Sequence, residues 1–203
     1  MGSMQTWILI ALTVGVSWAA FERPRLADRL VLWPPAITRK HEYDRLVTYG
    51  FVHADWTHVL FNMFTLYFFG PLAERYYAET VGPLGFPLFY LTALVAAALP
   101  SYLRHRNDGS YRTLGASGAV AAVLFTYVLL NPWGIIYVFV IPCPAVIYGV
   151  LYLGYSAWAD RQARGNVNHS AHYWGALYGI ACAIAAEPRV VAYFLARLTA
   201  PGS

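Results

Sequence analysis

The stretch TLGASGAVAAVLFTYVLL, residues 113–130, is apolar enough to lie in a membrane and yet carries a serine near its start. Ser117 stands among small residues, with Gly115 two positions before it and Gly118 directly after it. A polar side chain inside a membrane segment is costly, and it is therefore a candidate for function. The stretch indicates a membrane helix that carries a candidate reactive group.

Composition extends the membrane assignment to the whole chain. Of the 203 residues, 59% are hydrophobic and 12% are charged, whereas soluble domains have about 45–50% and about 25%. Cys143 and Cys182 both lie in apolar runs, which favours buried thiols over a disulfide. The formal charge of +4 is modest, and basic residues do not alternate with aromatic ones. We therefore expect membrane lipids as partners and no nucleic acid.

Six windows approach the length of about 20 mostly apolar residues that a membrane helix needs. They are residues 4–21, 56–73, 84–103, 114–131, 133–159 and 170–186. They predict an all-α membrane protein, a bundle of six transmembrane helices in a single domain over residues 4–186. Residues 1–3 look like a remnant of the expression vector. Two connecting regions are expected to hold short elements: LVLWPPAI (residues 30–37) at the membrane interface, and an amphipathic helix in the C-terminal tail 187–203.

The unusual polar residues lie at the starts of alternate windows. Six spans place both termini on one side, so the even-numbered spans all begin on the opposite side. His58 and Asn62 lie early in the second window, Ser117 early in the fourth and His172 early in the sixth. Three separate stretches therefore bring polar groups to a similar depth on one face of the membrane.

These residue types suit acyl transfer. Ser117 is a nucleophile that needs a base within hydrogen-bond reach, and the imidazole of His172 titrates near working pH. His58 and Asn62 are four residues apart and share a helix face. Both can donate hydrogen bonds to a developing oxyanion, as can the backbone N–H of Ser117 at a helix start. Asp55, three residues before His58, is expected to cap the second helix rather than to complete a triad.

Small residues would allow the close approach that this chemistry needs. Gly115 and Gly118 lie on a small-residue stripe of the fourth window, and Gly175 and Gly179 lie on one of the sixth. Such stripes let helix backbones approach each other in membranes. Each residue also has a structural interpretation: a serine bonded to its own helix, an interfacial histidine, a polar contact between helices, glycines that serve packing alone. No HExxH motif is present, so neither a metal site nor a cofactor is expected.

Three motifs together resemble the rhomboid intramembrane serine proteases: HVLFN (58–62), GASGA (115–119) and AHYWGALYG (171–179). The resemblance implies a six-span rhomboid-like bundle of the bacterial type. It implies Ser117 as nucleophile, His172 as base, and an oxyanion hole made by His58, Asn62 and the Ser117 N–H. The implied activity is hydrolysis of peptide bonds in or near the transmembrane segments of other proteins. His53 also matches a position where the family often carries histidine, and residues 42–45 resemble a motif that fixes the first loop.

The sequence departs from the family pattern at two places. Rhomboids often carry Trp-Arg in the first loop, where this chain has Asp44-Arg45. Many have an aromatic residue four positions after the serine, stacked on the catalytic histidine, where this chain has Ala121. Tyr173 or an aromatic side chain of the fifth window would then have to hold His172. The alternative function is a catalytically inactive rhomboid-like protein that binds transmembrane clients.

Two further expectations concern entry and orientation. Pro142 and Pro144 are expected to break the fifth span and let it bend to admit a substrate, with a static kink as the alternative. The resemblance implies a bacterial inner membrane, with the site open to the extracytoplasmic side. The count of Lys and Arg opposes this orientation, because three lie on the side of the termini and eleven on the other. We follow the family, since acidic residues of the long first loop can pair with its arginines.

Overall fold

The computed structural model describes residues 3–138, 140–162 and 168–199, and almost all of its regular structure is helical. Residues 1–2 of the expected vector remnant and residues 200–203 of the tail lie outside these ranges. The α-helices are α1 Met4–Glu22, α2 Pro24–Leu30, α3 Pro34–Lys40, α4 Arg45–Thr48, α5 Trp56–Thr80, α6 Gly85–His105, α7 Ser117–Leu130, α8 Ala145–Gln162, α9 His169–Ala186 and α10 Arg189–Thr199. A 3-10 helix, η1, covers Tyr49–Phe51, and two strands are β1 Ile135–Val138 and β2 Ile141–Pro144.

Each of the six predicted windows overlaps one long helix, in the order α1, α5, α6, α7, α8 and α9, and several of these helices extend beyond their window. Two of them, α1 and α6, are long and apolar enough to cross a membrane. A third candidate span is α9 with α10, which are bent by 111° at their junction, and α7 is a shorter apolar helix. The protein is thus a mostly helical membrane protein with two to three candidate spans by length and composition. The expected helix in the tail is confirmed as α10.

The fifth window differs from the prediction. Its first part forms an antiparallel hairpin of β1 and β2, and α8 begins only at Ala145. Pro142 and Pro144 lie in β2 and precede α8, so the expected proline break within a helix is wrong. Proline lacks the N–H that a helix interior uses, whereas the edge strand of a two-stranded sheet tolerates it.

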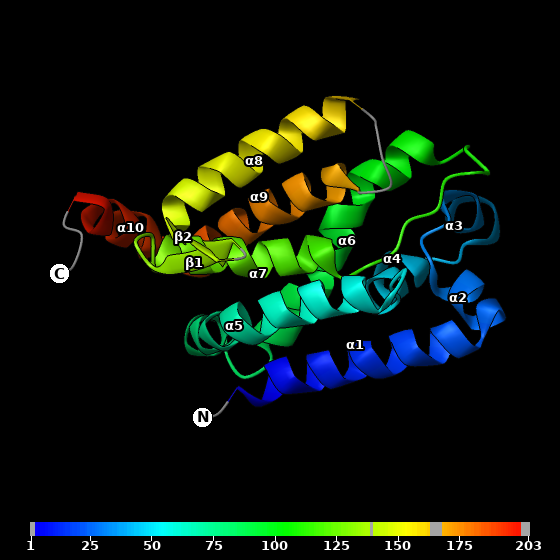
Figure 1. Ribbon diagram of the computed structural model, residues 1–203, viewed down its shortest axis with the longest axis horizontal. Coiled ribbons are helices and arrows are strands. Elements are labelled where there is room, and N and C mark those ends of the chain that lie inside the picture. Colours follow the sequence, from blue (N-terminus) through cyan, green and yellow to red (C-terminus); the bar gives the residue numbers. More distant parts are fainter. Residues whose placement is uncertain (1–2, 139, 163–167, 200–203) are drawn as a thin grey trace.

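The central helix is α7, which lies between α5 and α9 (Figure 1). Eleven of its 14 residues are buried, and a helix buried on every side is apolar on every side. In Figure 1, α5, α7 and α9 all start at the same end of the bundle, opposite the start of α1. This arrangement brings the first residues of the three helices together.

Backbone contact between α7 and α9 occurs at glycines. A Cβ atom added to Gly175 would lie 2.8 Å from the carbonyl carbon of Gly118 and 3.0 Å from its Cα. A Cβ on Gly179 would lie 2.7 Å from the Cα of Ala122. Gly118 in turn faces α6, where a Cβ would lie 2.5 Å from the Cβ of Ala97. The small side chains are therefore what lets α7 sit this close to two neighbours.

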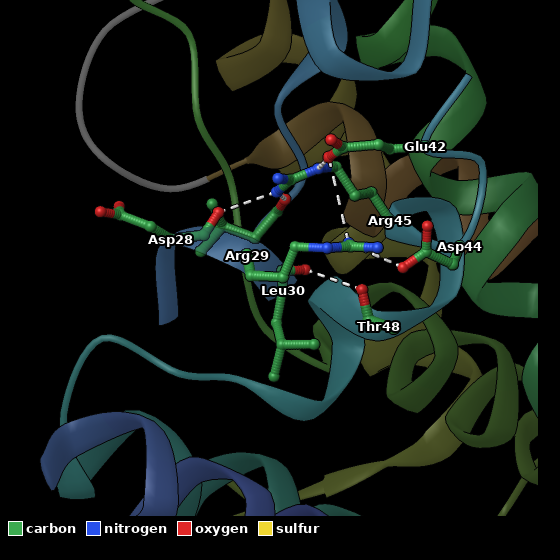
Figure 2. A network of polar contacts seen from close by, with 8 residues as sticks. Asp28, Arg29, Leu30, Glu42, Asp44, Arg45 and Thr48 are labelled. Atoms are coloured by element: carbon green, nitrogen blue, oxygen red, sulfur yellow. Dashed lines mark hydrogen bonds and ion pairs between the residues drawn. The ribbon is translucent and has the colours of Figure 1, made fainter. Parts of the chain in front are cut away.

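A buried arginine organises the first loop (Figure 2). Arg45 is 5% exposed. Its Nε donates to the Glu42 carboxylate at 2.6 Å, and its Nη1 donates to the carbonyl oxygens of Asp28 and Val31, both at 2.8 Å. The hydrogen bond from Arg45 lowers the pKa of the Glu42 carboxyl group. One guanidinium group thus joins the C-terminal end of α2 to the start of α4, 14 to 17 residues later in the chain.

A second set of contacts reinforces the loop and links it to the segment before α7. Arg29 donates to the carboxylate of Asp44 at 2.8 Å, so the aspartate at the departure from the family pattern has a partner within the loop (Figure 2). Thr48 donates to the carbonyl of Leu30 at 2.9 Å. The backbones of Leu32 and Thr113 then pair with each other, at 3.0 and 3.2 Å. The first loop therefore holds the chain that leads into Ser117.

Replacing Arg45 by methionine is expected to lower the free energy of unfolding by about 2 kcal/mol, because buried acceptors lose their donor. The measurement is thermal unfolding of the purified protein in detergent. Arg25→Met is the matched control, since Arg25 is exposed in the same loop and surface changes usually stay within about 0.5 kcal/mol. Equal shifts for the two variants would show that the Arg45 contacts do not hold the loop.

Candidate active site

One cavity collects the four polar residues that the sequence pattern selects. It has a volume of about 500 Å³, and Ser117, His172, His58 and Asn62 all line it. Ser117 and His172 come from the first turns of α7 and α9, and His58 and Asn62 come from the first two turns of α5. The rest of the wall combines further polar residues with apolar and aromatic side chains, among them Phe61, Leu124, Tyr148 and Tyr152. The structure therefore gathers a nucleophile, an imidazole and two hydrogen-bond donors around one cavity.

Ser117 is the first residue of α7. The first amides of a helix have no carbonyl partner within it, and the helix start carries partial positive charge. The backbone N–H of Ser117 is therefore placed to donate to an anion.

Gly115 does not pack against α9, contrary to the sequence prediction. It precedes α7 with φ +113°, a conformation that favours glycine. A Cβ there would lie 2.6 Å from Cε1 of His58. Gly115 instead makes the turn into α7 and leaves room for the imidazole of His58. The prediction assumed that the fourth helix includes Gly115. Because α7 begins at Ser117, Gly115 lies in the turn before the helix and not on its small-residue stripe.

His58 and Asn62 are fixed by the start of α5. Asp55 is the N-cap of α5 and accepts the backbone N–H of His58 at 2.8 Å, which confirms the predicted capping role. Asn62 is 5% exposed and its Nδ2 donates to the carbonyl of His58 at 2.9 Å. Because an amide carries two N–H donors, one of them remains for a ligand in the cavity.

Asn168, which sequence reasoning did not select, anchors the start of α9. Its Oδ1 accepts the N–H of Ala171 at 3.0 Å and the hydroxyl of Ser101 on α6 at 3.1 Å. Its Nδ2 donates to the hydroxyl of Tyr111 at 3.2 Å. An asparagine directly before an apolar helix is an N-cap signal, so the sequence could have revealed it. The contacts position the first turn of α9, which carries His172.

The aromatic neighbour of His172 is Tyr152 of α8. The two ring centroids are 6.1 Å apart and the planes differ by 23°. Tyr152 also packs in the cluster that contains Ala121, whose methyl group leaves room for the larger ring. Tyr173, the other expected candidate, instead packs edge-on against Trp174. Tyr152, an aromatic residue of the fifth window, therefore lies beside His172 and takes the place of the aromatic residue that the family pattern has at the position of Ala121.

Ser117 and His172 both line the cavity, and among the described residues no hydrogen bond joins their side chains. Catalytic hydrogen bonds are often long before substrate binds and tighten in the reacting complex. The arrangement is thus compatible with a serine activated by an imidazole once a substrate fills the cavity.

Comparisons with known proteins agree with the motifs. The family described as the rhomboid domain matches residues 40–188. The chain is 34% identical over 148 residues to RHOMBOID-like protein 12, mitochondrial, of Arabidopsis thaliana, covering 64% of this chain and 43% of the relative. It is 37% identical over 153 residues to Rhomboid-like protein 11, chloroplastic, of the same plant, covering 67% and 50%. It is 31% identical over 139 residues to Rhomboid protein 1, mitochondrial, of Saccharomyces cerevisiae, covering 64% and 38%. The chain spans half or less of the length of these relatives.

Proposed function

The chain belongs to the rhomboid family, and from that premise we propose that it is an intramembrane serine endopeptidase. It would hydrolyse peptide bonds in or near the transmembrane segments of other membrane proteins. The observation that carries the proposal is the meeting of Ser117, His172, His58 and Asn62 at one cavity. Family membership and the apolar helices make the chain an integral membrane protein.

The proposal includes six spans and, from the resemblance to the bacterial type, a bacterial inner membrane with the site open to the extracytoplasmic side. Membrane lipids and transmembrane substrates are its partners. The relatives described above are named as mitochondrial or chloroplastic. The bacterial assignment rests on the sequence resemblance, and a further relative supports it: the chain is 31% identical over 121 residues to Putative rhomboid protease YdcA of Bacillus subtilis, covering 57% of each protein.

The reaction uses the chain's own side chains and water. The Oγ of Ser117 attacks the scissile carbonyl while His172 accepts its proton. Negative charge on the carbonyl oxygen is stabilised by His58, Asn62 and the N–H of Ser117. His172 then protonates the leaving amine, and water releases the acyl group from Ser117. The ring of Tyr152 beside His172 limits the orientations of the imidazole, a task that an aspartate performs in a triad.

The substrate must unwind locally before it can react. A transmembrane helix holds its carbonyl groups in internal hydrogen bonds, so an intact helix does not offer one to Ser117. The apolar part of the cavity, with Phe61, Leu124 and Tyr148, suits an apolar side chain of an unwound segment. We therefore expect substrates with helix-weakening residues close to the cleavage site.

A fluorophosphonate probe tests the proposal directly. The folded parent protein is expected to form a covalent adduct that mass spectrometry maps to Ser117, and Ser117→Ala is expected to form none. Ser110→Ala is the matched control, because Ser110 lies in an exposed loop, and it should label like the parent. A folded parent that stays unlabelled in detergent and in liposomes would favour the alternative, an inactive rhomboid-like protein that binds transmembrane clients.

A further inference from the structure

A buried serine connects α1 to the candidate active site. Ser17 has 0% exposure, and its hydroxyl donates to the carbonyl of Phe51 at 2.9 Å. The same oxygen lies 2.9 Å from Nδ1 of His53. Because a hydroxyl has a single hydrogen, the hydrogen in the second contact belongs to the imidazole. His53 thus donates from Nδ1 to Ser17.

The other nitrogen of the same ring reaches the residue before the nucleophile. Nε2 of His53 accepts the backbone N–H of Ala116 at 3.3 Å, so it carries no hydrogen. Both contacts therefore require the same neutral tautomer of His53. The ring is 4% exposed, and burial lowers the pKa of His53, which favours this neutral form.

His53 touches both sides of the proposed oxyanion hole. On one side it holds Ala116, and the preceding amide of Gly115 is held by the carbonyl of Tyr49 at 2.9 Å. On the other side its ring packs edge-on against His58, with centroids 4.8 Å apart and planes at 77°. The position of one imidazole thus affects both the Ser117 amide and the His58 side chain.

We propose that Ser17 and His53 are positioning residues of the hydrolytic site. Ser17 fixes the orientation and tautomer of His53, and His53 fixes the backbone before Ser117 and the ring of His58. The inference rests on the proposed endopeptidase function. It gives α1 a part in the reaction, although α1 lies outside residues 40–188, the part of the chain that the family match covers.

The test compares kcat and KM for a transmembrane substrate in liposomes. Ser17→Ala is expected to lower kcat about tenfold with KM within twofold, because positioning in the transition state is lost while substrate binding stays. The matched control is Thr13→Val, one turn earlier on α1. Thr13 is equally buried at 0% exposure, but its hydroxyl has no hydrogen-bond partner among the described residues. Its removal is expected to leave kcat within twofold of the parent.

Variants of His53 separate positioning from general stability. His53→Ala is expected to lower kcat about 100-fold. His53→Gln keeps an acceptor for the Ala116 N–H and should retain most of the parent protein's kcat. Ser17→Ala should have no further effect in the His53→Gln protein, because residues on one path are not additive. All rates are measured at a temperature well below the unfolding midpoint of every variant.

The outcomes distinguish the two proposals. An active parent in which Ser17→Ala and Thr13→Val have equal kcat would overturn the positioning role and leave the protease function intact. Lower unfolding midpoints with unchanged kcat for the Ser17 and His53 variants would also overturn it, because that is the signature of a purely structural contact. A folded parent without activity on any transmembrane substrate would overturn the proposed function and the positioning role with it.

Discussion

Replacing His172 by alanine is expected to lower kcat for peptide-bond cleavage by a factor on the order of 10⁶, the scale seen when one member of a serine–histidine unit is lost. Ser117→Ala is expected to lower it equally, and the double variant by no more than either single one. The reason is that the two side chains act as a unit, so that either loss removes the whole activated nucleophile. Single-turnover cleavage of a transmembrane substrate in liposomes measures all three.

His169→Ala is the matched control for this prediction. His169 lies one turn earlier on α9 and packs edge-on against His172, with ring centroids 6.0 Å apart. It does not belong to the cavity lining, so its loss is expected to change kcat by less than about tenfold. A large loss for His169→Ala together with a small one for His172→Ala would mean that the base is assigned to the wrong histidine.

Gly175→Ala is expected to lower the free energy of unfolding by about 3 kcal/mol and kcat by about 100-fold. The added methyl group would lie 2.8 Å from the carbonyl carbon of Gly118. The atoms it meets belong to the backbone and cannot rotate away, so α7 and α9 must separate. Because Ser117 is on one helix and His172 on the other, the separation affects stability and chemistry together. Thermal unfolding and cleavage kinetics on the same preparation measure both effects.

Gly154→Ala shows what the same substitution does without a neighbour. Gly154 lies within α8, and a Cβ there would meet nothing within 4 Å. Alanine is favoured over glycine inside a helix by about 0.8–1.0 kcal/mol, so this variant should unfold at a slightly higher temperature with normal activity. If Gly175→Ala behaved in the same way, the close approach of α7 and α9 would not be required for function.

Hydropathy predicted the long helices because an apolar segment of about 20 residues is typical of a membrane helix. It failed in the fifth window, where Pro142 and Pro144 lie in a β-hairpin before α8. A short apolar run can be strand or helix, and periodicity alone does not separate the two. The first loop was likewise predicted only as an interfacial element. The packing of its short helices α2 and α4 depends on the contacts of Arg45 with carbonyl oxygens 14 and 17 residues earlier in the chain, which no local pattern encodes.

The sequence predicts those residues of the candidate site that are unusual for the segment in which they lie. Ser117 and His172 stand out as polar groups in apolar windows. Tyr152 does not stand out, since aromatic residues are common in this chain, and its place beside His172 depends on how α8 packs. The role of Gly115 depends on where α7 begins, and helix ends are the least predictable part of an element.

The short length of α7 determines how deep Ser117 lies in the membrane. Its 14 residues rise by about 21 Å in an α-helix, whereas the hydrocarbon core of a bilayer is about 30 Å thick. With its last residue level with one face of that core, its first lies roughly 9 Å beneath the other. In the proposed protease, Ser117 would then act at a depth where lipid excludes water, and the cavity that it lines would have to supply water for hydrolysis. Under the proposed function, a substrate would be cleaved at that depth, inside its own membrane segment.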